Sequence, residues 1–324
     1  MNRLIRPVAG MLATCVAAVI LVLWARAYSV SSHDIDLLWA NLAWWTLPIL
    51  LALLAVHVGA AALRWSRIEQ ALGAERPRFQ RAFTSGAIAL GLGTFLPSFL
   101  TNIAARAISN RLRGDNAVRG AVSGTLDQLT DLAVVVLFVP AAILGVFWHS
   151  LPLYLAGVVV TGGLGFLWLR VAPPIARAFA RIGVARHLGD ASQRLARRDV
   201  LLPIYALSLL RFFCLTAITL LVHFATGAAT VSATVIAIPL VTLAISLAML
   251  PGGLGVSEWS FSAVFAAMGI AHGAVVLFVL GNRILLSVMA LFLMALTLGH
   301  AAGVKLKHRR PTSLPPEAEP TPVQ

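Results

Sequence analysis

Long apolar runs separated by short polar segments make up most of the chain. A membrane-spanning helix needs about 20 mainly apolar residues to cross the hydrocarbon, and several runs approach that length while others are interrupted by Gly and Pro. The pattern predicts an all-α, polytopic integral membrane protein with about seven to eight membrane segments plus re-entrant helices. The candidate segments are residues 8–24, 43–63, 82–100, 127–148, 151–169, 201–223, 233–250, 256–271 and 273–299.

The end of the chain differs from the rest. Lys and Arg cluster in residues 305–310, and a Pro-rich stretch with few apolar residues follows. Such a composition does not bury enough apolar surface to fold. We therefore expect one integral membrane domain over residues 1–304, and a basic anchor with a disordered cytoplasmic tail over residues 305–324.

The first apolar run allows two interpretations. It follows Arg3 and Arg6 and precedes Ala25-Arg26-Ala27, which resembles a signal-peptidase site. The apolar core of a signal peptide is typically about 7 to 15 residues long. Because this run is longer and further spans follow it, we favour a retained first helix over a cleaved signal peptide.

Composition agrees with a chain that lies mostly in lipid. Of its residues 59% are hydrophobic and 11% are charged, which excludes a soluble globular protein. The 25 Lys and Arg exceed the 12 Asp and Glu, for a formal net charge of +13. Because the bases occur in short runs between apolar segments, they indicate loops at an anionic membrane surface, and we expect no nucleic-acid partner.

The positions of the cations predict topology. Residues 1–6, 64–81, 106–119, 170–198 and 305–310 hold 22 of the 25 Lys and Arg. Under the positive-inside rule all five segments are cytoplasmic only if residues 82–100 enter and leave the membrane on the same side. We therefore expect a re-entrant hairpin there and cytoplasmic N- and C-termini; an ordinary helix with one badly oriented basic loop is the alternative.

Two proline breaks occupy corresponding places in the two halves of the chain. Pro97 interrupts the first half, within Leu96-Pro97-Ser98. The second break has the sequence Leu250-Pro251-Gly252-Gly253-Leu254-Gly255. Pro ends a helix and Gly permits tight turns. Two interrupted membrane segments of this kind are typical of an inverted repeat, with a binding site where the repeats meet.

Charged side chains inside membrane segments are costly, so they are the strongest indicators of function. We expect five to meet around a polar cavity and to neutralise one another; buried ion pairs that only hold helices together are the alternative. Asp127 and Asp131 share one helix face, where their spacing also fits capping at a helix start or a shared metal. The candidate residues are Asp127, Asp131, Arg211, Glu258 and Arg283, with Asn282 beside the last.

The motifs of membrane enzymes are absent from the sequence. There is no His-Glu-x-x-His zinc site and no nucleotide-binding loop, and Asp127 and Asp131 lack the further acids of a two-metal site. We therefore expect no enzymatic activity, no metal and no cofactor. A membrane-embedded transferase remains a third hypothesis, although no nucleophile and base can be assigned to it.

Four motifs resemble the membrane region of lysylphosphatidylglycerol synthases and the stand-alone, flippase-like proteins related to it in bacteria and archaea. The resemblance covers most of residues 5–300. The most specific motif is Pro251-Gly252-Gly253-Leu254-Gly255-Val256-Ser257-Glu258. The others are Leu63-Arg64-Trp65 with Leu72-Gly73, Leu96-Pro97-Ser98 with Arg106, and Leu126-Asp127-Gln128-Leu129-Thr130-Asp131.

The resemblance implies two re-entrant segments related by a pseudo-twofold axis and a cavity in which a lipid headgroup changes leaflet. It adds Arg106 to the candidate binding residues and implies a bacterial plasma (inner) membrane. The chain departs from the family pattern where Thr101, Asn102 and Ile103 replace a Gly and an acid, and where Gln128 replaces an Arg. It ends soon after the last expected span, so we expect no aminoacyl-transferase domain and no synthase activity.

The first functional hypothesis is a flippase-like protein that binds a lipid or lipid-linked headgroup and translocates it between leaflets. Arg211 and Arg283 would meet a phosphate, while the acids would balance them or contact a cationic or hydroxylated headgroup. The partners implied are phospholipids, polyprenyl-linked lipids or hopanoids. The alternative is a non-transporting scaffold for a lipid-biosynthetic enzyme.

Overall fold

The described part of the chain is helical and contains no strands. The computed structural model describes the backbone of residues 2–75, 77–180, 197–227 and 230–309, and the side chains of residues 14–75, 77–167, 197–227 and 230–303. In chain order the elements are α1 (Asn2–Ala27), α2 (Ser32–Asn41), α3 (Thr46–Ala71), α4 (Phe79–Leu92), α5 (Ser98–Arg111), α6 (Ala117–Phe147), α7 (Leu151–Ala180), α9 (Arg198–Thr226), α10 (Val231–Ala248), the short 3-10 helix η2 (Pro251–Gly253), α11 (Val256–Ala267) and α12 (His272–Arg309).

Five described helices are long and apolar enough to cross a membrane: α3, α6, α9, α10 and α12. The number rises to six if the apolar end of α1 and the sharply bent α2 form one broken span. The apolar part of α7, Leu151–Leu167, is shorter. An all-α, multi-pass membrane protein is thus confirmed, with fewer full-length spans than the apolar runs predict.

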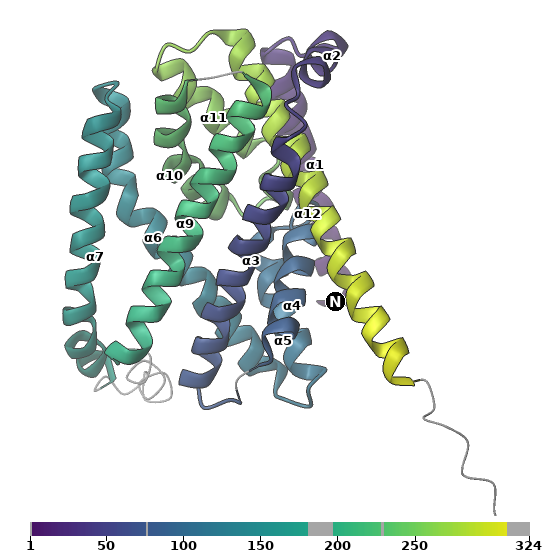
Figure 1. The fold of residues 1–324 in the computed structure, drawn as a ribbon, viewed down its shortest axis with the longest axis vertical. Coiled ribbons are helices and arrows are strands. Elements are labelled where there is room, and N and C mark those ends of the chain that lie inside the picture. The colour runs from purple at the N-terminus through teal and green to yellow at the C-terminus, as the bar shows by residue number, and fades with distance from the viewer. Residues whose placement is uncertain (1, 76, 181–196, 228–229, 310–324) are drawn as a thin grey trace, which may run out of the picture.

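Two short helices lie side by side where the sequence predicts a re-entrant hairpin over residues 82–100. The predicted bounds are too short, because that segment covers most of α4 and only the start of α5, which continues to Arg111. We call α4 and α5 the first hairpin. Each has 14 residues, about 21 Å at 1.5 Å per residue, which is too short to cross the hydrocarbon. Figure 1 shows both in the lower half of the bundle, with the chain entering α4 and leaving α5 at the lower end. The two helices are separated at Pro97, as the sequence predicts.

A second hairpin approaches from the opposite end of the bundle. It consists of α10, η2 and α11, which lie in the upper half in Figure 1. The chain turns at Pro251, and Gly252, Gly253 and Gly255 all have positive φ angles, of 57°, 63° and 78°. L-residues with a Cβ adopt this region only with strain. The three glycines therefore let the chain reverse inside the protein.

The tips of the two hairpins contact each other. The backbone N–H of Gly252 donates a hydrogen bond of 3.1 Å to the carbonyl oxygen of Leu96, the residue before Pro97. A Cβ added to Gly252 would overlap the carbonyl oxygen of Thr94. The two proline breaks, far apart in sequence, thus meet inside the bundle at a point where only glycine fits.

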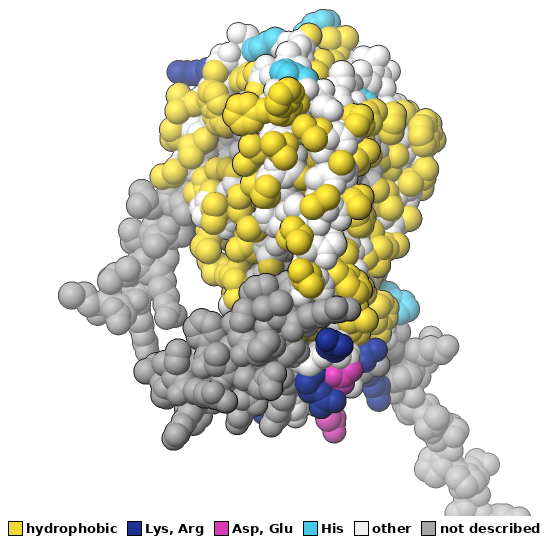
Figure 2. Space-filling view, turned by 90° about the vertical axis from the view of Figure 1, so that its left-hand side faces the viewer, with side chains coloured by type: hydrophobic (Ala, Val, Ile, Leu, Met, Phe, Trp, Pro, Cys, Tyr) yellow, Lys and Arg dark blue, Asp and Glu magenta, His cyan; other side chains and the backbone are white. Residues whose placement is uncertain are grey.

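Helices α3, α9 and α12 form the core against which both hairpins pack. Their buried apolar side chains belong to one cluster that includes Leu50, Ile218 and Phe278. α1 joins this cluster through Trp24, whose indole Nε1 donates to Ser262 Oγ on α11 at 2.9 Å. Figure 2 shows an outer face dominated by hydrophobic side chains, with a cluster of described Lys and Arg at its lower end and a further basic side chain near its upper end. This distribution suits a bundle surrounded by lipid.

One predicted boundary is wrong. The helix expected to begin at Asp127 begins at Ala117 and is capped by Asn116, whose side chain accepts from the Val118 N–H. The two aspartates therefore lie inside α6 and do not cap its start. The basic cluster expected after the last span follows the apolar part of α12, His272–Gly303, and its first residues continue that helix to Arg309. The expected tail at residues 310–324 lies outside the described residues.

We predict that Gly252→Ala destabilises the protein more than Gly269→Ala. Both glycines have positive φ, but a Cβ on Gly269 has no neighbour within 4 Å. Gly269→Ala should thus carry only the left-handed backbone cost of about 1–2 kcal/mol, whereas Gly252→Ala adds the overlap with Thr94. Melting temperatures of the purified variants in detergent test this. Equal losses would show that the tip contact is not tight.

Candidate functional site

A chain of alternating charges connects α3, α5, α6 and α9 in the interior. Arg64 on α3 is fully buried; its Nε donates to Asp127 Oδ1 at 2.7 Å and its Nη2 donates to the Asp127 carbonyl oxygen at 2.8 Å. Its Nη1 bonds both Asp131 and the Ser208 hydroxyl. One guanidinium thereby joins both aspartates of α6 to α9. We call Arg64, Arg106, Asp127, Asp131 and Arg211 the ion network.

The two ends of the ion network are arginines. Arg211 on α9 pairs with Asp131 through Nη1, and its Nη2 lies 3.0 Å from His57 Nε2. Because a guanidinium only donates, His57 Nε2 must accept and Nδ1 carries the hydrogen that points to the Arg211 carbonyl oxygen, at 3.2 Å. At the other end Arg106 lies 3.9 Å from Asp127 and donates to the Ala82 carbonyl oxygen at 2.9 Å.

A series of further buried polar side chains begins at Arg106. Its guanidinium carbon lies 4.5 Å from the ring centroid of Trp65, and the Trp65 indole donates to Ser123 Oγ at 2.9 Å. Ser123 in turn donates to Glu69, which also accepts from Asn110. With Glu69 counted, three arginines face three acids, so the region is formally neutral. Its charged groups bind one another and hold the helices in place.

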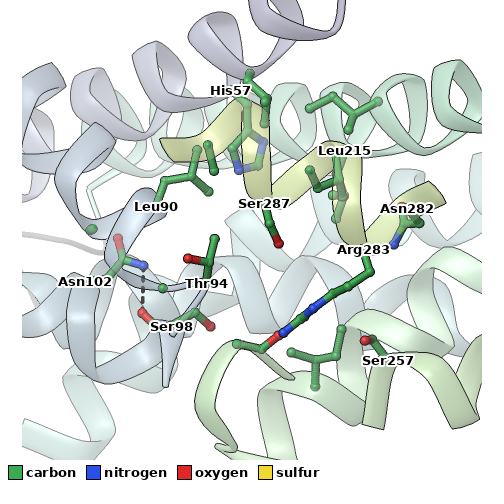
Figure 3. A pocket seen from close by; sticks show the side chains of 18 residues that line it. His57, Leu90, Thr94, Ser98, Asn102, Leu215, Ser257, Asn282, Arg283 and Ser287 are labelled. Carbon is green, nitrogen blue, oxygen red and sulfur yellow. Dashed lines mark hydrogen bonds between the residues drawn. The ribbon is translucent and has the colours of Figure 1, made fainter. Parts of the chain in front are cut away.

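A separate cavity of about 240 Å³ lies where the hairpin tips meet α3, α9 and α12. It is near mid-height, since His57 and Leu215 lie in the middle of α3 and α9. Figure 3 shows polar side chains converging on this space from several helices. The polar lining residues are His57, Thr94, Ser98, Asn102, Ser257, Asn282, Arg283 and Ser287, and the larger apolar ones are Leu54, Leu90, Leu215, Ile218, Ile245 and Leu286.

Arg283 is the one Lys or Arg among the described residues that line this cavity. Its side chain, 25% exposed, extends from α12 to the second hairpin, where Nη1 donates to the Gly252 carbonyl oxygen at 2.6 Å. Nε lies 3.7 Å from Oε1 of the buried Glu258, too far for a hydrogen bond. In contrast to Arg64, Arg283 is loosely paired and reaches into open space.

The sequence-predicted site residues separate into two groups. Arg106, Asp127, Asp131 and Arg211 belong to the ion network, whereas Asn282, Arg283 and Gly252 line the cavity, with Glu258 behind Arg283. The expectation that all five intramembrane charges meet around one cavity is therefore wrong. His57 connects the groups, because it lines the cavity and bonds Arg211.

Three residues that the structure places in these two groups or next to them are not among the sequence-predicted site residues: His57, Arg64 and Glu69. Arg64 and Arg106 had been counted among the cations of cytoplasmic loops, but both are fully buried. The available signal was the motif Leu63-Arg64-Trp65, which places an arginine directly against an apolar run. Among the described residues no group of three or more His, Cys, Asp or Glu could hold a metal ion; Asp127 and Asp131 bind arginines.

Fold and site together define a polytopic helical membrane protein in which the tips of two opposed hairpins line a cavity together with α3, α9 and α12. The family model described as the lysylphosphatidylglycerol synthase TM region matches residues 11–297. The chain belongs to this family, and it is therefore a membrane protein related to lipid synthesis or flipping. Comparisons with curated proteins and with solved structures give no match.

We predict that Asp127→Leu is strongly destabilising. Removing one partner of a buried pair leaves an uncompensated charge and costs about 3–5 kcal/mol, here on Arg64 and Arg106. The matched control is Asp199→Leu, which breaks the exposed Arg197–Asp199 pair and should cost about 0–1 kcal/mol. Thermal melting in detergent gives both values. Similar melting temperatures for the two variants would contradict a structural role for the ion network.

Proposed function

We propose that this protein binds the polar headgroup of a membrane lipid in the central cavity and lets it pass between the two leaflets. The observation that carries the proposal is the position of the cavity: it has Arg283 and other polar side chains in its lining, lies near mid-height of the bundle, and is lined by the tips of hairpins that enter from opposite ends. Irregular backbone at membrane depth is tolerated where it lines such a cavity, and transporters place binding sites there.

The physical barrier to lipid crossing is removal of the headgroup from water. An uncompensated charge in hydrocarbon is costly. The cavity supplies substitutes for water: the Arg283 guanidinium, the hydroxyls of Thr94 and Ser98, and the amide of Asn282. In this proposal only the headgroup enters the cavity, and the acyl chains stay in the surrounding lipid. These groups would lower the barrier without any chemical change in the lipid, so we propose a translocase and no enzyme.

Orientation follows from charge. The loops after α3 and α5 and the start of α9 lie at one end of the bundle (Figure 1) and are rich in arginine. By the positive-inside rule we propose that this end is cytoplasmic, with both termini on that side, and that the membrane is a bacterial plasma membrane. The first hairpin would then enter from the cytoplasm and the second from outside.

The proposal predicts that Arg283→Gln slows headgroup crossing by about tenfold or more. One charge-assisted hydrogen bond contributes about 1.5–3 kcal/mol, and 1.4 kcal/mol corresponds to a factor of ten. The assay is exposure of labelled phospholipids and polyprenyl phosphates to a membrane-impermeant quencher in proteoliposomes. Arg197→Gln is the matched control, because Arg197 is 67% exposed and far along the chain from the cavity residues.

Two results would contradict the proposal. Crossing no faster than in empty liposomes for every lipid, with lipid still bound by the purified protein, would favour the scaffold that holds a lipid for a biosynthetic enzyme. Equal rates for Arg283→Gln and Arg197→Gln would show that crossing does not pass through the cavity. Melting temperatures of both variants confirm that they are folded.

A further inference from the structure

His57 is the one described residue of the cavity lining whose side chain gains or loses a proton near neutral pH. The described lining contains no Asp, Glu, Lys, Tyr or Cys, and Arg283 stays charged because a guanidinium keeps its proton in proteins. An unperturbed imidazole titrates near pH 6.5, to about half a unit. A change of charge on the cavity wall near neutral pH is therefore expected at His57.

The hydrogen bonds of His57 show that its ring is neutral in this structure. Its Nε2 lies 3.0 Å from Arg211 Nη2, which can only donate, so Nε2 carries no hydrogen. Its Nδ1 donates to the Arg211 carbonyl oxygen at 3.2 Å. A second proton on the ring has to bind Nε2, where it would point at the guanidinium. Protonation of His57 therefore requires that the ring separates from the Arg211 side chain.

The cavity of about 240 Å³ gives the ring room to turn away from Arg211. His57 is half-buried, and in Figure 3 its ring extends from α3 toward the space inside the cavity. The pair of Arg211 with Asp131 uses Nη1, a different nitrogen from the one that faces His57. The ring can therefore take up a proton from bulk water at Nε2 while the Arg211–Asp131 pair stays intact.

Charged groups from several helices face His57. They are Arg211 on α9, Asp131 on α6 and Arg64 on its own helix, with Arg283 on the α12 wall of the same cavity. The described lining residues of α4, α5 and α10 carry no charge. Cations outnumber acids in this set, and an anion that enters the cavity would offset them. Such an anion therefore favours a protonated His57.

Charge balance gives the proton a role in headgroup binding. Arg283 is the charged side chain of the described lining, and Glu258 lies behind it at 3.7 Å, so the two together are formally neutral. An anionic headgroup in the cavity would add one uncompensated negative charge at membrane depth, which is costly. One proton on His57 restores neutrality. A zwitterionic headgroup adds no net charge and needs no proton.

We infer that the cavity binds an anionic phosphate headgroup together with one proton, and that His57 takes up this proton. The phosphate binds at Arg283, the proton passes from bulk water to His57 Nε2, and the loaded cavity is formally neutral. This inference rests on the proposed function for the cavity and adds a bound proton to it. Because coupling is reciprocal, protons strengthen headgroup binding by the same factor by which the headgroup strengthens proton binding.

The test is isothermal titration calorimetry of the purified full-length protein in detergent, in two buffers of different ionisation enthalpy. The difference in heat gives the number of protons taken up per lipid bound. The probes are dioctanoyl phosphatidylglycerol, which is anionic, and dioctanoyl phosphatidylcholine, which is zwitterionic. Phosphatidylglycerol should bind with net proton uptake, and its affinity should fall about tenfold or more between about pH 5.5 and about pH 8. Phosphatidylcholine should cause no uptake.

A variant of His57 assigns the proton to this residue. His57→Gln keeps an acceptor and a donor for Arg211 but cannot gain a proton near neutral pH. It should still bind phosphatidylglycerol, without proton uptake and with an affinity that no longer changes with pH. His33→Gln is the matched control, because His33 is exposed on α2 and is not part of the lining, and it should keep the wild-type uptake. If His57→Gln does not fold, the two lipids on the wild type still decide whether a proton is bound.

The outcomes distinguish this inference from the function on which it rests. Binding of phosphatidylglycerol without proton uptake across the pH range, or equal uptake with both lipids, overturns the inference and leaves headgroup binding intact. Absence of binding to both phospholipids and to the anionic geranyl phosphate overturns both. Uptake that persists unchanged in His57→Gln places the proton on another group, such as Glu258, and overturns the assignment to His57.

Discussion

The hydrogen bond between the Gly252 N–H and the Leu96 carbonyl oxygen is the constraint on which the cavity depends. In a bilayer every backbone polar group must find a partner within the protein. Each proline break interrupts a helix at depth and frees such groups. Here the Gly252 N–H of one break donates to the Leu96 carbonyl oxygen of the other, and Arg283 donates to the carbonyl oxygen of the same glycine. The hairpins can therefore end inside the bundle, and the cavity lies where they end.

The charged side chains of the interior form two groups that differ in how completely they are hydrogen-bonded. In the ion network each acid contacts at least one arginine, and Arg64 alone makes bonds to α6 and α9. Its members bind one another, and such buried pairs fix geometry more than they add stability. At the cavity, Arg283 and Glu258 remain 3.7 Å apart and the carboxylate oxygen nearest Arg283 has no donor. The Arg283–Glu258 pair is thus less completely bonded than the pairs of the ion network.

Sequence predicted the helical membrane fold, the first hairpin, and both glycine- and proline-based breaks, because these depend on local rules for apolar length and backbone freedom. It did not predict the division of the charges. Arg64 adjoins the apolar run 43–63, so it marked the end of a span, whereas its partners lie more than 60 residues away on α6. Which charges meet depends on how α3, α6 and α9 pack, and that information is not local.

The departures from the family pattern have a structural meaning in this light. Asn102, one of three residues that replace a Gly and an acid, lines the cavity, and its amide donates to Ser98 O within its own helix at 2.9 Å. An acid there would have placed a carboxylate in a lining that has no Asp or Glu among the described residues. Without that acid, the described residues of the first hairpin that line the cavity are uncharged, and Arg283 on α12 is the charged side chain of the lining. Gln128, the other departure, neighbours Asp127 in sequence, yet Arg64 from α3 supplies the cation that this aspartate binds. The cation that balances Asp127 thus comes from another helix, whereas the charged side chain that lines the cavity is Arg283.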